Sequence, residues 1–501
     1  MGKAEERRSG ITLLLISFLV PLTVYKGLHN YVLIKLSLTE TLIILSLVIW
    51  LGRGLWSGRD LKLRRTPLDR PLLLFFLLML LSLAGSAYRW AGVPAIYRLA
   101  TYLLLYGLSV NSLRKGEDLN RIVFVWLFST GLAVLDGLYE YYFQGMLPPR
   151  STFGNANFFA AYLVLVFPLT LALFLQSIFS WRNVRVTPHL NPLPQGEKRL
   201  RDTIPLPQEG EGRVRGRLRK KGLKIFSLAV LLLLMTYTLF LTSSRGAWLG
   251  LGVGLISLGW LACLRLRRRW IAARLIPAFL VLVLITAAAL SPWLLGRKSI
   301  QKGLERGTMG LRVLIWEGTT RMIAAHPFLG SGLGSFRFAY PQYRVPAYFS
   351  NPHAVNGTAH AHNEFLEVAA ETGLLGLAAF LGVLIVFFRK GTDLVRREAD
   401  GAQRALTMGL ISGVAALLAT NLVGVNLRFA SSGIFLWLVL GLVMSRTVWT
   451  CRGRIHPTRS NGRHKCRPYN CLKGISSTIK LAITGYGLVN YPPSCGGLSS
   501  S

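Results

Sequence analysis

The stretch TAHAHNEFLEVAAETGLLGL, residues 358–377, leads from two histidines and an asparagine into a long apolar run. A helix needs about 20 mostly apolar residues to cross a bilayer, and comparable apolar blocks recur along the whole chain. The sequence is 52% hydrophobic and only 16% charged, with a mean hydropathy of +0.43. A soluble core of this size needs far less apolar surface. The sequence therefore predicts an all-α integral membrane protein.

We expect about 12 transmembrane helices from this length requirement. Their centres fall near residues 18, 41, 78, 103, 132, 168, 232, 254, 283, 378, 415 and 438. Residues 11–25 are short for a span, but no small-residue cleavage site follows them. We therefore interpret them as a retained first helix and not as a signal peptide. A large loop is expected between helices 9 and 10.

The formal charge of +37 is spread unevenly over the connections between these helices. Most basic residues lie near the two ends and after the even-numbered spans, as in 181–224, 265–274 and 389–404. Because positive charge is retained on the cytoplasmic side of membrane proteins, both termini are expected in the cytoplasm and residues 295–362 outside it. Topology thus explains the basicity, and no nucleic-acid partner is expected.

The outer loop carries eight arginines and lysines between residues 297 and 344. Long loops are translocated largely regardless of their charge. The positive-inside rule therefore allows basic residues here but gives no reason for their presence. Lipid headgroups and an anionic ligand are both open as their partners. A helix is predicted from about residue 309, ended by His326-Pro327 and a glycine-rich turn.

Two arginines on this predicted helix differ in their surroundings. Arg312 and Arg321 are nine positions apart, which is about 900° of rotation, so they point to opposite sides. Glu317 precedes Arg321 by four residues in the favourable order for a helical ion pair. Arg321 therefore has a structural partner but stays among the candidate substrate-binding residues, whereas Arg312 is the better ligand candidate.

The histidines at the start of the tenth predicted span allow three interpretations. His353, His360 and His362 with Glu364 offer metal donors, but no established zinc spacing is present. Alternatively, a histidine at the membrane interface can simply cap the helix. As a third possibility, the helix dipole keeps His362 neutral and able to accept a proton near pH 7. Asn363 and Glu364 suit the helix start itself.

Four stretches together resemble the O-antigen ligase and polymerase superfamily of bacterial membrane glycosyltransferases. They are STFGNANFFAAYL at 151–163, TSSRGAWLGL at 242–251, LRVLIWEGTTRMIAAHPFLGSGLGSF at 311–336 and AHNEFLEVAAETGLLGL at 361–377. Such enzymes move glycans, as in lipopolysaccharide biosynthesis, from an undecaprenyl diphosphate carrier to an acceptor at the periplasmic face of the inner membrane. The resemblance implies functional roles for Arg245, Arg312 and His362.

The implied chemistry agrees with the properties of these side chains. Guanidinium groups bind diphosphate oxygens bidentately and keep their charge at any pH, so no metal and no cofactor are expected. His362 is expected to take the proton of the acceptor hydroxyl, giving inversion, while His360 and Glu364 orient it. For Arg245, contact with lipid headgroups is the alternative to diphosphate binding. Asn155 and Asn157 suit either helix capping or substrate contact.

The expected partners are an undecaprenyl-diphosphate-linked glycan donor, membrane lipid, and a glycan, lipid A core or protein acceptor. Ligase, polymerase and protein O-oligosaccharyltransferase activities share this site and differ only in the acceptor. A multi-span solute transporter is the alternative of another class. Transporters usually place ionisable residues in mid-span and carry repeated halves, and apart from Asp136 we find neither.

The chain is expected to be organised around this site in one bacterial inner-membrane protein. The 181–222 segment is predicted to be disordered because of its Pro, Gly and charge content. The cysteines and histidines after residue 450 are spaced irregularly for zinc, and no disulfide is expected there. The expected parts are helices 1–5 in 1–150, helix 6 in 151–180, a basic cytoplasmic insertion in 181–222, helices 7–9 in 223–294, a periplasmic catalytic loop in 295–362, helices 10–12 in 363–449 and a basic cytoplasmic tail in 450–501.

Overall fold

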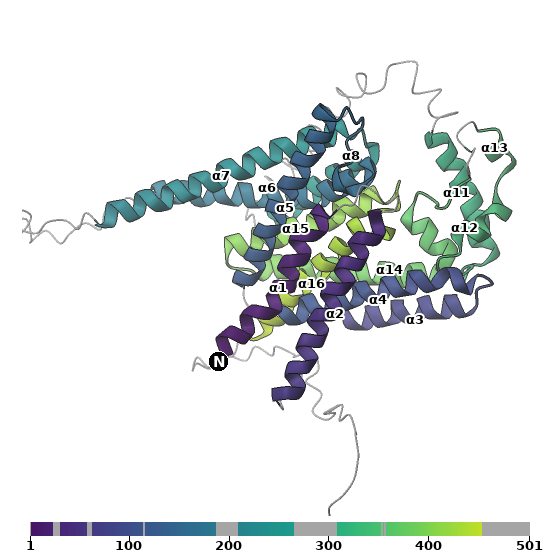
Figure 1. Ribbon diagram of the computed structural model, residues 1–501, viewed down its shortest axis with the longest axis horizontal. Helices are drawn as coiled ribbons and strands as arrows, with labels where there is room; N and C mark the ends of the chain where they lie inside the picture. The colour runs from purple at the N-terminus through teal and green to yellow at the C-terminus, as the bar shows by residue number, and fades with distance from the viewer. Residues whose placement is uncertain are drawn as a thin grey trace, which may run out of the picture. The chain divides into compact units, whose positions relative to one another are not determined.

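The computed structural model describes residues 2–23, 31–57, 63–113, 116–186, 209–264, 308–351, 354 and 357–452. Within these ranges every regular element is a helix, and Figure 1 shows their arrangement. The longer helices are α1 (Gly2–Leu22), α2 (Tyr31–Ser57), α3 (Asp69–Ala84), α4 (Arg89–Ser112), α5 (Gly116–Phe143), α6 (Ala156–Val186), α7 (Glu209–Leu241), α8 (Arg245–Cys263), α11 (Thr308–Ala325), α14 (Glu364–Arg397), α15 (Gly401–Thr420) and α16 (Ala430–Arg452). The short ones are η1 (Ser151–Phe153), α12 (Phe336–Ala339), η2 (Tyr340–Tyr343), α13 (Pro346–Phe349) and η3 (Asn426–Arg428).

The all-helical class predicted from the sequence is confirmed for the described ranges. Every predicted span centre lies inside one of these helices except the one near residue 283, which falls outside the described residues. Seven of the described helices are long and apolar enough to cross a membrane, namely α4, α5, the 156–181 part of α6, the 219–241 part of α7, α8, α14 and α15. Shorter apolar helices cover Gly10–Leu22 and Ser432–Val448. The full number of spans stays a prediction, as does the outer position of residues 295–362.

The helix predicted from about residue 309 to His326-Pro327 is confirmed, because α11 spans Thr308–Ala325. Helices α6 and α7 extend to Val186 and from Glu209, so both enter the range that was expected to be a disordered insertion. Residues 187–208 between them, and the tail after residue 452, lie outside the described residues.

Close helix packing depends on small residues, as is usual between membrane helices. Helix α15 packs against both α6 and α8, α14 packs against α3, and α16 packs against α4. A Cβ atom on Gly413 of α15 would lie 2.1 Å from the backbone oxygen of Leu165 in α6. A Cβ atom on Gly250 of α8 would lie 2.6 Å from the backbone oxygen of Ala416 in α15. Glycine therefore sets the separation of these three helices.

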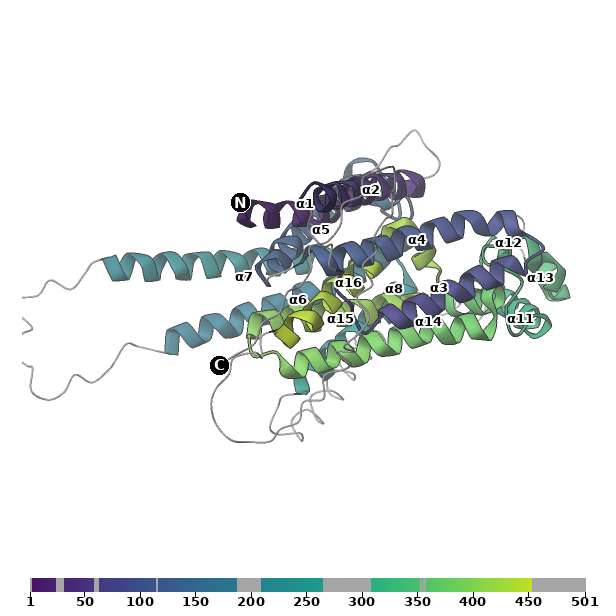
Figure 2. The ribbon, with the colours of Figure 1, turned by 90° about the horizontal axis from the view of Figure 1, so that it is seen from below.

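Helix α14 is interrupted at Gly373, where the glycine-rich segment after α11 docks on it. Gly373 has φ +70°, and a Cβ atom there would lie 2.0 Å from the oxygen of Phe328. Leu374 N donates to Pro327 O at 2.7 Å, and Gly332 N donates to Glu371 O at 2.9 Å. The docked segment thus satisfies backbone groups that the interruption frees. In both ribbon views α11, α12 and α13 gather at one end of α3 and α14 (Figures 1 and 2).

Candidate active site

The two histidines lie on a short turn that enters α14. The Asn363 side chain caps this helix, accepting hydrogen bonds from Phe365 N at 3.0 Å and Leu366 N at 3.1 Å. The predicted helix start at Asn363 and Glu364 is therefore confirmed. His362 has φ +53°, in the left-handed region that residues other than glycine seldom adopt. We call residues 358–363 the histidine turn.

Contacts from α11 and α14 hold the histidine turn in place. Trp316 Nε1 donates to Ala361 O at 2.9 Å, and Ala361 N donates to Glu367 Oε2 at 2.7 Å. The other oxygen of Glu367 lies 2.8 Å from His360 Nδ1. A carboxylate beside Nδ1 favours the tautomer that carries the proton there, which leaves Nε2 with its lone pair. The His360 side chain is 34% exposed.

Arg312 lies on α11 four residues before Trp316, so the two side chains share one face of the helix. Arg312 is half-buried, and no hydrogen bond or carboxylate partner for it exists in the described ranges. Burial lowers its pKa. The charge of Arg312 also affects His362. The pKa of His362 is lowered to about 4, chiefly by burial, then by Arg312 and then by His360, while Glu367 acts in the opposite direction.

His362 is consequently neutral near pH 7. The neutral state agrees with the prediction from the sequence, but its causes are burial and a neighbouring cation and not chiefly a helix dipole. The geometry thus pairs an uncompensated guanidinium with an uncharged imidazole.

Arg321 occupies the opposite, exposed face of α11. It forms the predicted ion pair with Glu317, with Nη2 and Oε1 2.8 Å apart and the arginine side chain 54% exposed. The structure therefore separates Arg321 from the face that carries Arg312 and Trp316.

Arg245 begins α8, where it is exposed and has no recorded partner among the described residues. Its neighbour Gly246 packs against the end of α15, since a Cβ atom there would lie 2.7 Å from Val423 Cγ2. The same segment after α15 accepts hydrogen bonds from Glu364 N, through Asn421 O at 2.9 Å and Gly424 O at 3.1 Å. Residues 421–424 therefore connect the start of α8 with the start of α14.

Asn155 and Asn157 lie at the start of α6, and both are exposed. Asn155 Oδ1 accepts a hydrogen bond from Asn157 N at 2.8 Å, which is a capping contact. The following residue, Phe158, has its ring centroid 4.0 Å from that of Phe429, which in turn lies 5.8 Å from the ring of His360. These rings bring the start of α6 to the same end of the helices as the histidine turn.

A buried charge cluster behind the histidine turn was not predicted from the sequence. Glu364, Glu367 and Glu371 recur every three or four residues on one face of α14 and are 5%, 1% and 1% exposed. Arg428 contacts all three: Nε lies 3.2 Å from Glu364 Oε1 and 3.1 Å from Glu367 Oε1, and Nη1 lies 2.7 Å from Glu371 Oε2. We call these four residues the Arg428 cluster.

A signal for this cluster was present in the sequence. Three carboxylates on one face of an apolar helix require a nearby cation, and Arg428 is the basic residue of the segment that joins α15 to α16. Burial lowers the pKa of Arg428, but Glu367, Glu371 and Glu364 outweigh that effect and raise it above the ordinary value.

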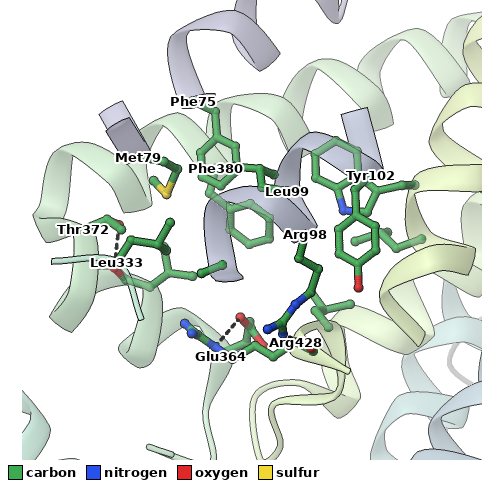
Figure 3. A pocket seen from close by; sticks show the side chains of 15 residues that line it. Phe75, Met79, Arg98, Leu99, Tyr102, Leu333, Glu364, Thr372, Phe380 and Arg428 are labelled. Carbon is green, nitrogen blue, oxygen red and sulfur yellow. Dashed lines mark hydrogen bonds and ion pairs between the residues drawn. The ribbon is translucent and has the colours of Figure 1, made fainter. Parts of the chain in front are cut away.

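A cavity of about 120 Å³ adjoins the Arg428 cluster. Glu364, Arg428, Arg98 and Tyr102 line one side, while apolar residues such as Phe75, Met79 and Phe380 line the other (Figure 3). The guanidinium of Arg98 donates through Nη1 to the backbone oxygen of Arg428. The cavity therefore joins a charged end at the start of α14 to an apolar region between α3, α4, α14 and α16.

The fold and this site together define a multi-pass membrane protein in which arginines and histidines gather at one end of the helices. Comparison with protein families matches residues 230–381 to the family described as O-antigen ligase. This match supports the membership in the O-antigen ligase family that the motifs indicate. The matched segment includes Arg245, Arg312 and His362. The comparison with curated proteins found no match.

The match supports an enzyme of the ligase and polymerase kind, with glycan and lipid-linked substrates in general. The matched segment covers the last part of α7, all of α8, α11, α12 and α13, and the first half of α14. Asn155, Asn157 and Arg428 lie outside it, so their assignment to the site depends on the contacts described above.

Proposed function

We propose that this protein is a metal-independent glycosyltransferase of the O-antigen ligase type. It moves a glycan from an undecaprenyl-diphosphate carrier to an acceptor hydroxyl at the periplasmic face of the bacterial inner membrane. The anomeric carbon is inverted, because the acceptor displaces the diphosphate in a single step. Arg312 and Arg245 bind the diphosphate, and His362 accepts the proton of the acceptor.

The observation that carries this proposal is the uncompensated charge of Arg312 beside a neutral His362. A half-buried guanidinium without a carboxylate partner suits an anionic ligand, which removes the cost of leaving the charge unpaired. Planar guanidinium groups match phosphate oxygens bidentately. They also stabilise the negative charge that grows on the diphosphate as its bond to the sugar breaks.

Arg245 supplies a second cation at the same end of the helices. Its exposure suits contact with the more accessible part of a carrier headgroup at the membrane surface. Residues 421–424 link its helix to the start of α14, so we expect it to contact the same ligand as the histidine turn. A diphosphate has enough oxygens for two guanidinium groups on different helices.

The state of His362 depends on whether the donor is bound. With a pKa of about 4, the free imidazole is a weak base. An anionic diphosphate on Arg312 offsets the positive charge that lowers this pKa, so binding raises the pKa of His362 toward its ordinary value. In the reaction, the acceptor oxygen bonds to the anomeric carbon, its proton passes to His362, and the bond to the diphosphate breaks with its electron pair on the diphosphate oxygen.

The test is transfer by purified protein in liposomes, supplied with an undecaprenyl-diphosphate glycan and three acceptors in parallel. The acceptors are lipid A core, a second lipid-linked glycan and an acceptor peptide. Release of undecaprenyl diphosphate together with glycan on one acceptor supports the proposal, and the acceptor used identifies the subclass. Failure to release the diphosphate with any acceptor, combined with solute uptake into the same liposomes, would overturn it in favour of a transporter.

A further inference from the structure

We infer that Arg428 and Glu367 are positioning residues that fix the histidine turn for catalysis. The inference rests on the proposed function and adds two residues to it: Glu367, to which the resemblance assigns no role, and Arg428, which lies outside the matched residues. Its basis is the set of contacts by which one buried carboxylate joins the Arg428 cluster to the turn.

Glu367 uses both of its oxygens on the histidine turn. Oε1 lies 2.8 Å from His360 Nδ1, and Oε2 accepts from Ala361 N at 2.7 Å. Ala361 is completely buried between these contacts and the indole of Trp316. The carboxylate therefore holds one ring and one backbone amide in the two residues that directly precede His362.

Arg428 makes this use of a buried carboxylate possible. Glu367 is 1% exposed, and a carboxylate withdrawn from water is strongly destabilised unless a cation accompanies it. Arg428 lies on the same oxygen that contacts His360, and it also ion-pairs with Glu364 and Glu371. Arg98 in turn holds the backbone oxygen of Arg428, so the cation is fixed by a helix other than α14.

The Arg428 cluster also connects the turn to the segment that follows α11. Glu371 Oε1 accepts from Phe336 N at 3.1 Å, and its backbone oxygen accepts from Gly332 N and from Ser82 Oγ. Glu371 therefore holds the segment after α11, whereas Glu367 holds the histidine turn.

Glu367→Gln tests the inference because it keeps the shape of the side chain and removes one acceptor. A carboxylate accepts from both His360 Nδ1–H and Ala361 N–H, whereas an amide offers a single acceptor oxygen. Loss of the group that orients a metal-bound histidine lowers activity about 10- to 100-fold, and we expect a loss of similar size for the group that orients His360. We expect that loss in kcat, with KM for the donor changed by less than about threefold, because Arg245 and Arg312 are untouched.

Glu371→Gln is the matched control on the same helix. Glu371 is buried to the same degree and pairs with the same arginine, but it makes no recorded contact with the histidine turn. We expect its kcat to fall by less than about threefold. Arg428→Lys, which cannot span three carboxylates, should behave like Glu367→Gln. Arg446→Lys alters another buried arginine, paired with Glu398, and should retain activity.

Hydrogen exchange gives a readout that does not depend on turnover. Peptides covering residues 358–366 should exchange faster in Glu367→Gln than in wild type, and Glu371→Gln should match wild type. If Glu367→Gln fails to accumulate in the membrane, His360→Gln takes its place, since it breaks the same contact without disturbing the ion pairs. Its kcat should then fall at nearly constant KM.

The two proposals fail in different ways. If the wild-type protein transfers no glycan, the proposed function is overturned regardless of the activity of the variants. Wild-type protein that transfers glycan, with Glu367→Gln or His360→Gln at wild-type kcat and unchanged exchange, overturns the positioning role alone. An equal loss in Glu367→Gln and Glu371→Gln would also overturn it, because it would show that the buried charges matter only for stability.

Discussion

Trp316 Nε1 donates a hydrogen bond to the backbone oxygen of Ala361 across 2.9 Å. This bond links the helix that carries Arg312 directly to the turn that carries His362. Because Arg312 lies four residues before Trp316 and His362 follows Ala361, the bond sets the distance between the two groups to which we assign the chemistry.

Trp316→Phe should separate these groups while keeping an aromatic ring in place. Loss of one hydrogen bond to a buried carbonyl costs about 1 kcal/mol, which corresponds to about a fivefold change. We expect kcat/KM for transfer to fall by about that factor or more. Steady-state kinetics in liposomes measure it, and a variant as active as wild type would show that the indole hydrogen bond is dispensable.

The fall in transfer rate at low pH should depend on the lowered pKa of His362. In the free enzyme its pKa is about 4, so kcat/KM should stay level from about pH 8 to pH 5 and fall below that. Bound diphosphate raises this pKa, so the limb in kcat should lie at higher pH than the limb in kcat/KM. Initial rates across the pH range, under conditions where the protein stays folded, measure both.

Removing the charge of Arg312 provides a further check on the same group. Arg312 lowers the pKa of His362, so Arg312→Gln should move the acid limb of kcat/KM to higher pH. A limb near the ordinary histidine value in wild type, or one that does not move in the variant, would contradict the assignment of Arg312 and His362 as neighbours in the site.

Arg245 and Arg312 should each be replaced poorly by lysine. A lysine keeps the charge but loses the planar, bidentate contact with phosphate oxygens. We expect alanine variants to lose about 10-fold or more in kcat/KM for the donor, and lysine variants to recover only a minor part. Arg337→Ala, which removes an exposed guanidinium on α12, serves as the control. Full activity in both lysine variants would argue against bidentate binding.

Gly373→Ala should destabilise the docking of the glycine-rich segment on α14. Its φ of +70° and the 2.0 Å approach of Phe328 O leave no space for a Cβ atom. Such strain costs about 2 kcal/mol or more. Gly382→Ala on the same helix meets nothing within 4 Å and is the matched control. Thermal unfolding in detergent should show a lower Tm for the first variant only, and an equal Tm in both would contradict the described interruption of α14.

Much of the helical frame was predictable because membrane helices must be long and apolar. The start of α14 at Asn363–Glu364 and the Glu317–Arg321 pair were also predictable, because capping and helical ion pairs depend on local spacing. The Arg428 cluster was not predicted, because its arginine is 57 residues from Glu371 in the chain. Spacing on one helix reveals the carboxylates, but only the fold shows which cation reaches them.

For His362, too, part of the result was predictable from local sequence and part depends on tertiary contacts. Its neutrality was predicted from its place at a helix start, but the larger causes are burial and the charge of Arg312 on another helix. Likewise, the glycines after α11 were expected to form a turn, and their docking on the interruption at Gly373 depends on a contact between distant segments. Local patterns therefore identified the residues, while their chemical state came from tertiary contacts.

Transfer by His362 variants tests the central claim most directly. His362→Asn suits the comparison with His362→Ala, because asparagine adopts the left-handed conformation of this position more readily than alanine. With wild-type protein in liposomes transferring glycan from undecaprenyl diphosphate, we predict that both variants insert normally and bind the donor but transfer nothing measurable. Wild-type turnover in His362→Asn would contradict the account.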